Sequence, residues 1–338
     1  MTKPFPLHDA QVQMTLAALA YLDDTDPTGR TIPPVSDVKK ALIAGLANCD
    51  FSTKGEWTLA WGPIQTHGTD NLVYVARNET DKTLAVCLRG TTTQWLSRLE
   101  DIPTSQRRFP TANTSGAKVS SEFFTGLVEM LAAVDPDQST TLQDYLATQV
   151  AAGFGTVFVN GHSQGAALVP MMMAALQLGW ARRPGLRAAV RGFAFAPPTS
   201  GNPAFADWVN RSLDCWFVIN PLDIVPLGYA NIHDVTRRQI PGPLTLEEEL
   251  YVPALVDAAA ALAWAAGTWA QPDQRAMTQM VHEENEGFFD MVIDQHNHNT
   301  YLVMLGATPL VPFGQTGASP FAPGSIPLPH ITNVPVGP

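Results

Sequence analysis

The chain has 338 residues, 45% of them hydrophobic, and a formal net charge of −11 with only 20 lysines and arginines. A chain of this length can bury a large core, and its acidic balance argues against nucleic acid or anionic membrane surfaces as partners. Its three cysteines are scattered, which argues against a disulfide framework or a cysteine metal site.

The first nine residues lack the apolar core of a secretory signal. Cytoplasmic location is therefore the default expectation, with export by another route left open. The longest weakly charged stretch, 250–270, is mostly alanine and contains Asp257 and Pro253. This composition argues against a membrane-spanning helix.

Apolar residues at helical spacing predict a first helix over 11–21, and we expect loops to follow it. The runs 71–76 and 83–88 are apolar and rich in β-branched residues, and the polar residues 77–81 separate them. They predict a hairpin or a closely spaced pair of strands. Helical spacing returns from Ser121 to Val134 and again over 142–150.

Beyond residue 150, strands and helices are expected to alternate. Strands are predicted over 156–159, 190–196 and 215–220, with helices over 166–178 and 203–209 between them. This alternation predicts an α/β protein with a largely parallel central sheet covered by helices on both faces.

We expect one α/β domain over 1–305 with a helical cap or lid-like insertion at about 228–290. The insertion contains a predicted capping box from Thr245 to Glu248 and an alanine-rich stretch with Trp264 and Trp269. Whether 245–270 is a mobile lid or a buried helix stays open. Residues 306–338 contain no Asp, Glu, Lys or Arg and are rich in Pro and Gly, which predicts an irregular arm, either docked or disordered.

The most informative motif is Gly161-His162-Ser163-Gln164-Gly165, which follows the strand predicted at 156–159. G-x-S-x-G between a strand and a helix is typical of a nucleophile elbow, because a strained turn exposes the serine hydroxyl and only glycines fit beside it. The alternative is an ordinary turn with a solvated serine. The strand before the motif and the helix-forming run after it favour the elbow, with Ser163 as nucleophile.

A serine nucleophile needs a histidine as base and a carboxylate that orients it. Asp223 follows the strand predicted at 215–220, where such an acid is expected, although a turn aspartate would look the same. Among the later histidines, His296 and His298 are placed best, where we expect a late sheet strand to end. In an extended segment they would point the same way and compete for the role. No ligand spacing favours a metal site, and no cofactor is expected.

Two backbone N–H groups commonly hold the oxyanion in such enzymes. Gln164 follows the nucleophile, and its N–H is the first candidate. The strand at 83–88 ends in Arg89-Gly90-Thr91, and Thr91 offers both an N–H and a hydroxyl as the second.

Taken together, these motifs resemble the class 3 (fungal-type) lipase family over about residues 83–301. The shared features are Arg89-Gly90-Thr91 with Trp95, the elbow, Phe195-Ala196 with Gly201-Asn202, the run 220–226, and a late histidine before Tyr301-Leu302. Pro197-Pro198 and the apolar stretch after Asp223 depart from the family pattern.

The resemblance implies an α/β-hydrolase fold with Ser163 as nucleophile, Asp223 as acid and Thr91 in the oxyanion hole, beside a segment that often forms a lid. Some family members place the histidine five residues before the tyrosine and others three. We favour His296, with His298 as the alternative.

The chain is therefore expected to be a serine carboxylic-ester hydrolase without a cofactor, most simply a lipase that acts on a lipid ester, with a lipid–water interface as a further partner. The alternatives are a phospholipase A1 or short-chain esterase with the same triad, a catalytically silent lipid- or partner-binding module, and a membrane-interaction protein. The sequence leaves the acyl-chain length, the head group and the oligomeric state open.

Overall fold

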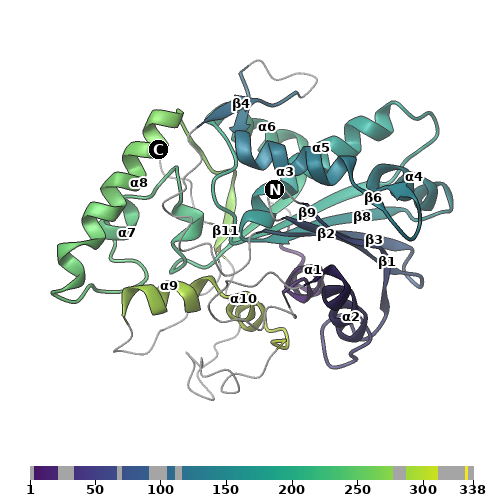
Figure 1. Cartoon of the computed structure of the whole chain (residues 1–338), viewed down its shortest axis with the longest axis horizontal. Helices are drawn as coiled ribbons and strands as arrows, with labels where there is room; N and C mark the ends of the chain where they lie inside the picture. Colours follow the sequence, from purple (N-terminus) through teal and green to yellow (C-terminus); the bar gives the residue numbers. More distant parts are fainter. Residues whose placement is uncertain are drawn as a thin grey trace.

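The computed structural model describes residues 4–21, 34–66, 71–90, 105–110, 116–276, 287–310 and 332–333. An eight-stranded sheet runs through its middle in the order β1-β2-β3-β8-β9-β10-β11-β12 (Figure 1). The strands are β1 (Trp57–Gln65), β2 (Leu72–Asn78), β3 (Thr83–Arg89), β8 (Thr156–His162), β9 (Ala189–Phe195), β10 (Asp214–Ile219), β11 (Gln274–Ala276) and β12 (Thr332–Asn333).

The strands from β3 to β11 in this order are parallel to one another, whereas β1, β2 and β12 join in antiparallel fashion. This confirms the predicted largely parallel sheet and the antiparallel pairing of 71–76 with 83–88. Two small antiparallel pairs lie outside the sheet: β4 (Gln106–Arg108) with β5 (Lys118–Ser120), and β6 (Val134–Asp135) with β7 (Thr140–Thr141).

Helices cover both faces of the sheet (Figure 1). One face carries α1 (Leu7–Leu19), α2 (Val35–Leu46) and α10 (His298–Met304); the other carries α3 (Ser121–Ala132), α4 (Leu142–Ala151), α5 (Gln164–Ala181) and α6 (Pro203–Ser212). Strand β3 shows how the sequence builds both layers: Leu84, Val86 and Leu88 enter the core beneath α5, and Ala85 and Cys87 enter the core beneath α1. Alternate residues of a strand face opposite sides, so an unbroken apolar run suits a strand buried on both.

A third group of helices lies beside one end of the sheet. It contains η3 (Val225–Leu227), α7 (Asp234–Arg237), η4 (Glu248–Leu250), α8 (Val252–Ala266) and α9 (Phe288–His296). Residues of this region form a separate small core, called the third core below: Ile224, Ile232, Val235, Ile240, Val252, Val256, Phe288 and Val292. They overlap the predicted cap at 228–290, whose boundaries stay a prediction.

The predicted capping box is present within this group. The Glu248 carboxylate accepts the N–H of Thr245 at 2.8 Å, and the Thr245 hydroxyl accepts the N–H of Glu248 at 3.3 Å. It lies at the start of the single turn η4. Most of the predicted arm at 306–338 lies outside the described residues.

The helices predicted from Ser121 and over 142–150, 166–178 and 203–209 are α3, α4, α5 and α6, and the strands predicted over 156–159, 190–196 and 215–220 are β8, β9 and β10. The expectation of loops after the first helix is wrong, because α2 and β1 lie there. Strand β1 contains Gly62-Pro63 and two register shifts, so the simple alternation that marks a strand is interrupted.

Candidate active site

Ser163 lies at the sharp turn between β8 and α5. Its backbone adopts φ 58° and ψ −132°, a conformation that a residue with a side chain rarely takes. The Ser163 N–H donates to the Phe195 carbonyl of the neighbouring strand β9 at 3.0 Å, which holds the turn against the sheet. The sequence therefore forms the strained strand-to-helix turn expected of a nucleophile elbow.

Three glycines allow this turn to pack against β3. A Cβ on Gly165 would lie 2.2 Å from the Leu88 carbonyl oxygen, and a Cβ on Gly161 would lie 2.5 Å from the carbonyl carbon of Gly165. A Cβ on Gly90 would lie 2.6 Å from the backbone nitrogen of Gly165. These contacts are backbone against backbone, so no side-chain movement can relieve them.

His296 joins the serine to the acid. Its Nε2 lies 2.8 Å from the Ser163 Oγ, and its Nδ1 lies 2.8 Å from the Asp223 Oδ2. All three side chains are buried. Because a carboxylate can only accept, Nδ1 carries the proton, which leaves Nε2 to accept the serine hydroxyl.

The histidine reaches this position from a helix. His296 is the last residue of α9, and Asn297 separates it from α10, whose first residue is His298. The expectation that these histidines follow a sheet strand and share an extended segment is therefore wrong. The break is stabilised by the Thr300 hydroxyl, which donates to the Asp294 carbonyl at 2.6 Å.

Asp223 sits in the turn after β10, as expected from the position of that strand. Its Oδ1 accepts the N–H of Val225 at 2.9 Å, and its own N–H donates to the Asn220 carbonyl at 3.0 Å. The Asn220 side-chain amide donates to the Gln295 side chain at 2.7 Å, which ties the turn to α9. The turn that carries Asp223 and the helix that carries His296 are thus joined by this hydrogen bond as well as by the direct contact between Asp223 and His296.

Tyr301 is a member of this constellation whose contacts sequence reasoning missed. Its hydroxyl donates to the Asp223 Oδ2 at 2.8 Å and accepts the N–H of Asn220 at 3.0 Å. Burial, and then the neighbouring Asp223 charge, raise the pKa of the Tyr301 phenol well above its usual range, so it stays a donor. The only signal in the sequence is its position five residues after His296.

His162 and His298 lie near His296 without entering the hydrogen-bond chain from Ser163 to Asp223. The His162 ring lies 4.8 Å from the His296 ring between centroids, and His298 stacks on Tyr21 at 5.3 Å. The His296 backbone approaches the His162 ring, but neither ring nitrogen of His162 meets hydrogen-bond geometry with a partner. Burial, followed by the neighbouring histidines, lowers the pKa of His162 well below its usual range. Burial and His296 lower the pKa of His298 to about 4. At neutral pH both are uncharged.

The structure thus brings Ser163, Asp223 and His296 together and places His298 aside. Gln164 is the first residue of α5, directly after the serine. Thr91, the other residue predicted for the oxyanion hole, lies outside the described residues. Within the part of the chain that is described, no group of three His, Cys, Asp or Glu side chains could hold a metal ion.

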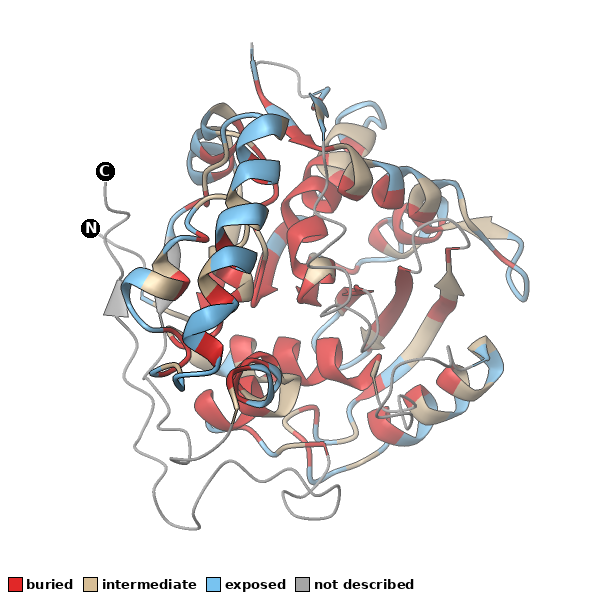
Figure 2. Cartoon of the chain, turned by 60° about the vertical axis from the view of Figure 1, so that its left-hand side comes forward, coloured by how far each residue is buried: buried red, intermediate tan, exposed pale blue. Residues whose placement is uncertain are grey.

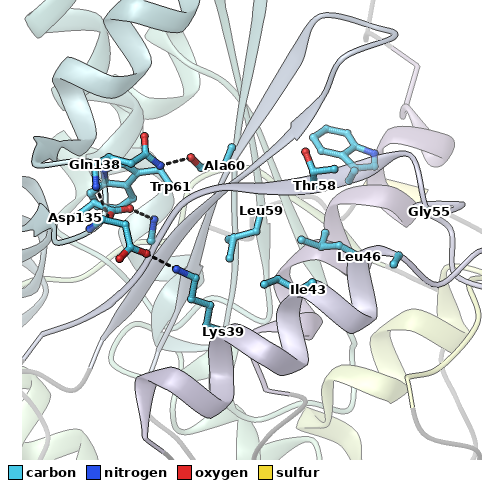
Figure 3. A pocket seen from close by; sticks show the side chains of 14 residues that line it. Lys39, Ile43, Leu46, Gly55, Thr58, Leu59, Ala60, Trp61, Asp135 and Gln138 are labelled. Carbon is cyan, nitrogen blue, oxygen red and sulfur yellow. Dashed lines mark hydrogen bonds and ion pairs between the residues drawn. The ribbon is translucent and has the colours of Figure 1, made fainter.

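A separate cavity of about 350 Å³ lies between α2 and β1, away from this constellation (Figure 3). Its wall is largely apolar, with Ile43 and Leu46 from α2 and Leu59 from β1. The Asp135 carboxylate at its end is satisfied by backbone N–H groups, among them that of Gly62 at 2.6 Å. A further cavity of about 540 Å³ lies near the end of α5. Neither is lined by the residues around Ser163.

Two of three comparisons with known proteins found similarities to lipases. Residues 85–230 match the family Lipase (class 3). Among solved structures, M37 lipase is 19% identical, with a TM-score of 0.72 over 89% of this chain and 93% of that one. Lipase II from Rhizopus niveus is 21% identical, with a TM-score of 0.49 over 65% of this chain and 74% of that one. The comparison with curated proteins returned no match.

Proposed function

We propose that this chain, which belongs to the class 3 lipase family through its match over residues 85–230 and has the α/β-hydrolase fold, hydrolyses lipid esters through an acyl-enzyme on Ser163. The observation that supports this most directly is the row of two 2.8 Å contacts that runs from the Ser163 Oγ through the His296 ring to the Asp223 carboxylate. Family membership gives the general class, a carboxylic-ester hydrolase. The individual roles and the lipid substrate are our proposal.

In the first step, the Ser163 Oγ attacks the ester carbonyl carbon while His296 Nε2 takes the hydroxyl proton. Asp223 stabilises the imidazolium that results. Because Asp223 is buried and accepts hydrogen bonds from His296, Tyr301 and the Val225 N–H, its carboxylate is already oriented before substrate arrives.

The tetrahedral intermediate needs donors for its oxyanion. We assign one of them to the N–H of Gln164, at the N-terminus of the 18-residue helix α5, where the helix dipole favours negative charge. Thr91 is our proposal for the second donor. Collapse of the intermediate breaks the carbon–oxygen ester bond, and His296 returns the proton to the leaving alcohol. Water then hydrolyses the acyl-enzyme by the same sequence of proton transfers.

A fluorophosphonate probe tests the nucleophile. The parent protein is expected to label on one serine, and Ser163→Ala is expected to lose the label. The control Ser105→Ala, which alters a serine directly before β4, is expected to label like the parent. A parent protein that does not label, but binds lipid as well as Ser163→Ala does, would instead identify a silent lipid-binding module.

Substrate class is tested separately. Rates on p-nitrophenyl esters of graded chain length, on a triacylglycerol emulsion and on a phospholipid distinguish a lipase from a short-chain esterase or a phospholipase A1. Our proposal expects the triacylglycerol to be hydrolysed and long acyl chains to be accepted. Hydrolysis of short, soluble esters alone would contradict the lipase assignment while leaving the nucleophile in place.

A further inference from the structure

The ring of His162 is enclosed by rings from three other parts of the chain. His162 ends strand β8, which is buried along nearly its whole length, and only 4% of the residue is exposed (Figure 2). The Tyr21 hydroxyl donates to the His162 carbonyl at 3.3 Å, which holds this strand end beside α1. The ring neighbours of His162 are Tyr21 just after α1, His296 at the end of α9, and His298 and Tyr301 in α10.

These neighbours meet the His162 ring in two different ways. Tyr21, His298 and Tyr301 stand nearly perpendicular to it, at interplanar angles of 89°, 85° and 75°. The His296 ring is the nearest of them, with centroids 4.8 Å apart, and is inclined by only 37°. Rings this close and this nearly parallel overlap with their faces, because rings lying side by side have centroids further apart. The perpendicular neighbours thus fix the ring of His162 with one face toward His296.

This contact adds to the hydrogen bonds of His296, because they use the edge of its ring and His162 meets its face. Nδ1 and Nε2 lie in the plane of the His296 ring, 2.8 Å from the Asp223 Oδ2 and the Ser163 Oγ. When Nε2 takes the serine proton, the ring becomes an imidazolium in a buried site. The electron-rich face of an uncharged aromatic ring attracts a cation, and burial strengthens this attraction. A contact that is stronger once the charge has formed lowers the barrier to proton transfer.

This effect requires His162 itself to stay uncharged. Burial, and then His296 and His298, lower the pKa of His162 well below its usual range, so its ring is neutral when the imidazolium forms. Arg89 opposes a second positive charge as well, because it is buried, always protonated and paired in register with His162 between β3 and β8. The titratable and charged groups around His162 are therefore Tyr21, Arg89, His296, His298 and Tyr301, with Asp223 behind His296 and Tyr301.

We propose that His162 is a positioning residue for His296: the face of its ring packs against the His296 ring and stabilises the imidazolium that forms during acyl transfer. The inference rests on the proposed hydrolysis through Ser163 and adds to it a residue that transfers no proton. Because His162 directly precedes Ser163, one strand end carries both the nucleophile and the support of its base. The nucleophile and the base are thereby held in one arrangement before substrate binds.

The pH profile of kcat/KM on p-nitrophenyl butyrate tests this role. His162→Leu removes the aromatic ring and keeps a similar side-chain volume. We expect the acid limb of the profile, where the general base becomes protonated, to move about one pH unit to lower pH, because the imidazolium loses its support. At the optimum, kcat should fall about tenfold with little change in KM. An acid limb that stays in place in a folded His162→Leu would overturn the proposal.

Three further variants separate the effect of the ring from that of its volume and its place. His162→Met is a second ring-free variant with a flexible side chain, and we expect the same shift from it even where His162→Leu misfolds. His162→Phe keeps a ring face and should lie closer to the parent than the ring-free variants in both measurements. His298→Leu is the matched control, because it removes a histidine of the same cluster whose ring stacks on Tyr21. It should keep the acid limb of the parent, and an equal shift in this control would contradict our account.

Proton NMR of the histidine rings keeps the test independent of turnover. In the parent, the low-field Nδ1 proton of His296 reports its contact with Asp223. We expect this resonance to persist in His162→Leu while the midpoint of the His296 titration falls by about one pH unit. Loss of the resonance would show that the substitution displaces His296, and the role of the ring face would be refuted. A parent that neither labels with a fluorophosphonate nor hydrolyses the ester would refute the proposed function, whereas an active parent with an unmoved midpoint in His162→Leu refutes this inference alone.

Discussion

Tyr301→Phe removes a single oxygen from the most buried part of the site. That oxygen donates to the Asp223 Oδ2 at 2.8 Å and accepts the Asn220 N–H at 3.0 Å, and all three residues are at most 2% exposed. The change costs a hydrogen bond to a charged group, worth about 1.5–3 kcal/mol, and leaves a buried N–H without its partner. We expect a total loss of about 3 kcal/mol in the free energy of unfolding.

The same substitution acts on the reaction through Asp223. With one donor fewer, the carboxylate keeps more negative charge for His296 and favours the imidazolium. A higher pH is then needed to obtain the neutral base. We expect the acid limb of the pH profile of kcat/KM on p-nitrophenyl butyrate to move to higher pH. The carboxylate also loses a contact that orients it toward His296. At the optimum we expect this loss of orientation to prevail, so that kcat falls about tenfold with little change in KM, which corresponds to about 1.4 kcal/mol of transition-state stabilisation.

Tyr74→Phe is the matched control, because Tyr74 is fully buried and donates to the Leu16 carbonyl beneath α1, away from the site. It should lower the melting temperature without moving the pH profile. If Tyr301→Phe and Tyr74→Phe give identical pH profiles, Tyr301 supports the fold alone and our account of its contact with Asp223 is wrong.

Three other predictions concern Asp223, the elbow and His298. Asp223→Asn should lower kcat by about 10⁴-fold, because the histidine loses its tautomer; a loss within about tenfold would remove Asp223 from the triad. Gly165→Ala should destabilise the protein by more than about 4 kcal/mol in thermal melting, since the new Cβ would lie 2.2 Å from the Leu88 carbonyl oxygen. Gly155→Ala, where a Cβ meets nothing within 4 Å, should be nearly neutral, and equal melting of the two variants would contradict this. The native pKa of His298 lies at about 4, below its ordinary 6.5, so between these values the unfolded state binds a proton that the native state does not. The free energy of unfolding should therefore fall as pH drops from 6.5 to about 4, and His298→Asn should flatten this slope by up to about 1.4 kcal/mol per pH unit; parallel urea-denaturation curves would contradict it.

The elbow and the strands around it could be predicted because their signals are local. Strand β8, the G-x-S-x-G turn and α5 occupy one continuous stretch, and each part has its own composition and period. The position of Asp223 followed from β10 in the same way. Two requirements of the glycines are not local: the close approach of Gly165 to Leu88, and that of Gly90 to Gly165.

Of the two segments that sequence reasoning missed, only β1 depends on contacts between distant parts of the chain. Strand β1 is interrupted by Gly62-Pro63, and only its pairing with β2 makes it a strand. Helix α2 has buried residues Val38, Leu42 and Leu46 four apart, a spacing that could have predicted it.

The histidine was expected after a strand, where the fold class usually places it, yet it ends a helix here. Spacing to Tyr301 favoured His296 over His298 without giving the physical reason, which is a break at Asn297 between α9, which ends at His296, and α10, which begins at His298. The direction of the Tyr301 hydroxyl likewise exists only in the folded chain. Such details follow from packing, which no window of sequence contains.

His296, the proposed general base, lies between two helices that pack on hydrophobic cores of unequal size. On one side, α9 packs through Phe288 and Val292 on the third core, which has eight buried residues. On the other side, α10 packs through Tyr301 and Leu302 on the far larger core beneath the sheet. Local opening costs least where the fewest apolar contacts must break. On warming, the enzyme should therefore lose turnover reversibly several degrees before the sheet melts, with inactivation starting in the helices rather than at the nucleophile.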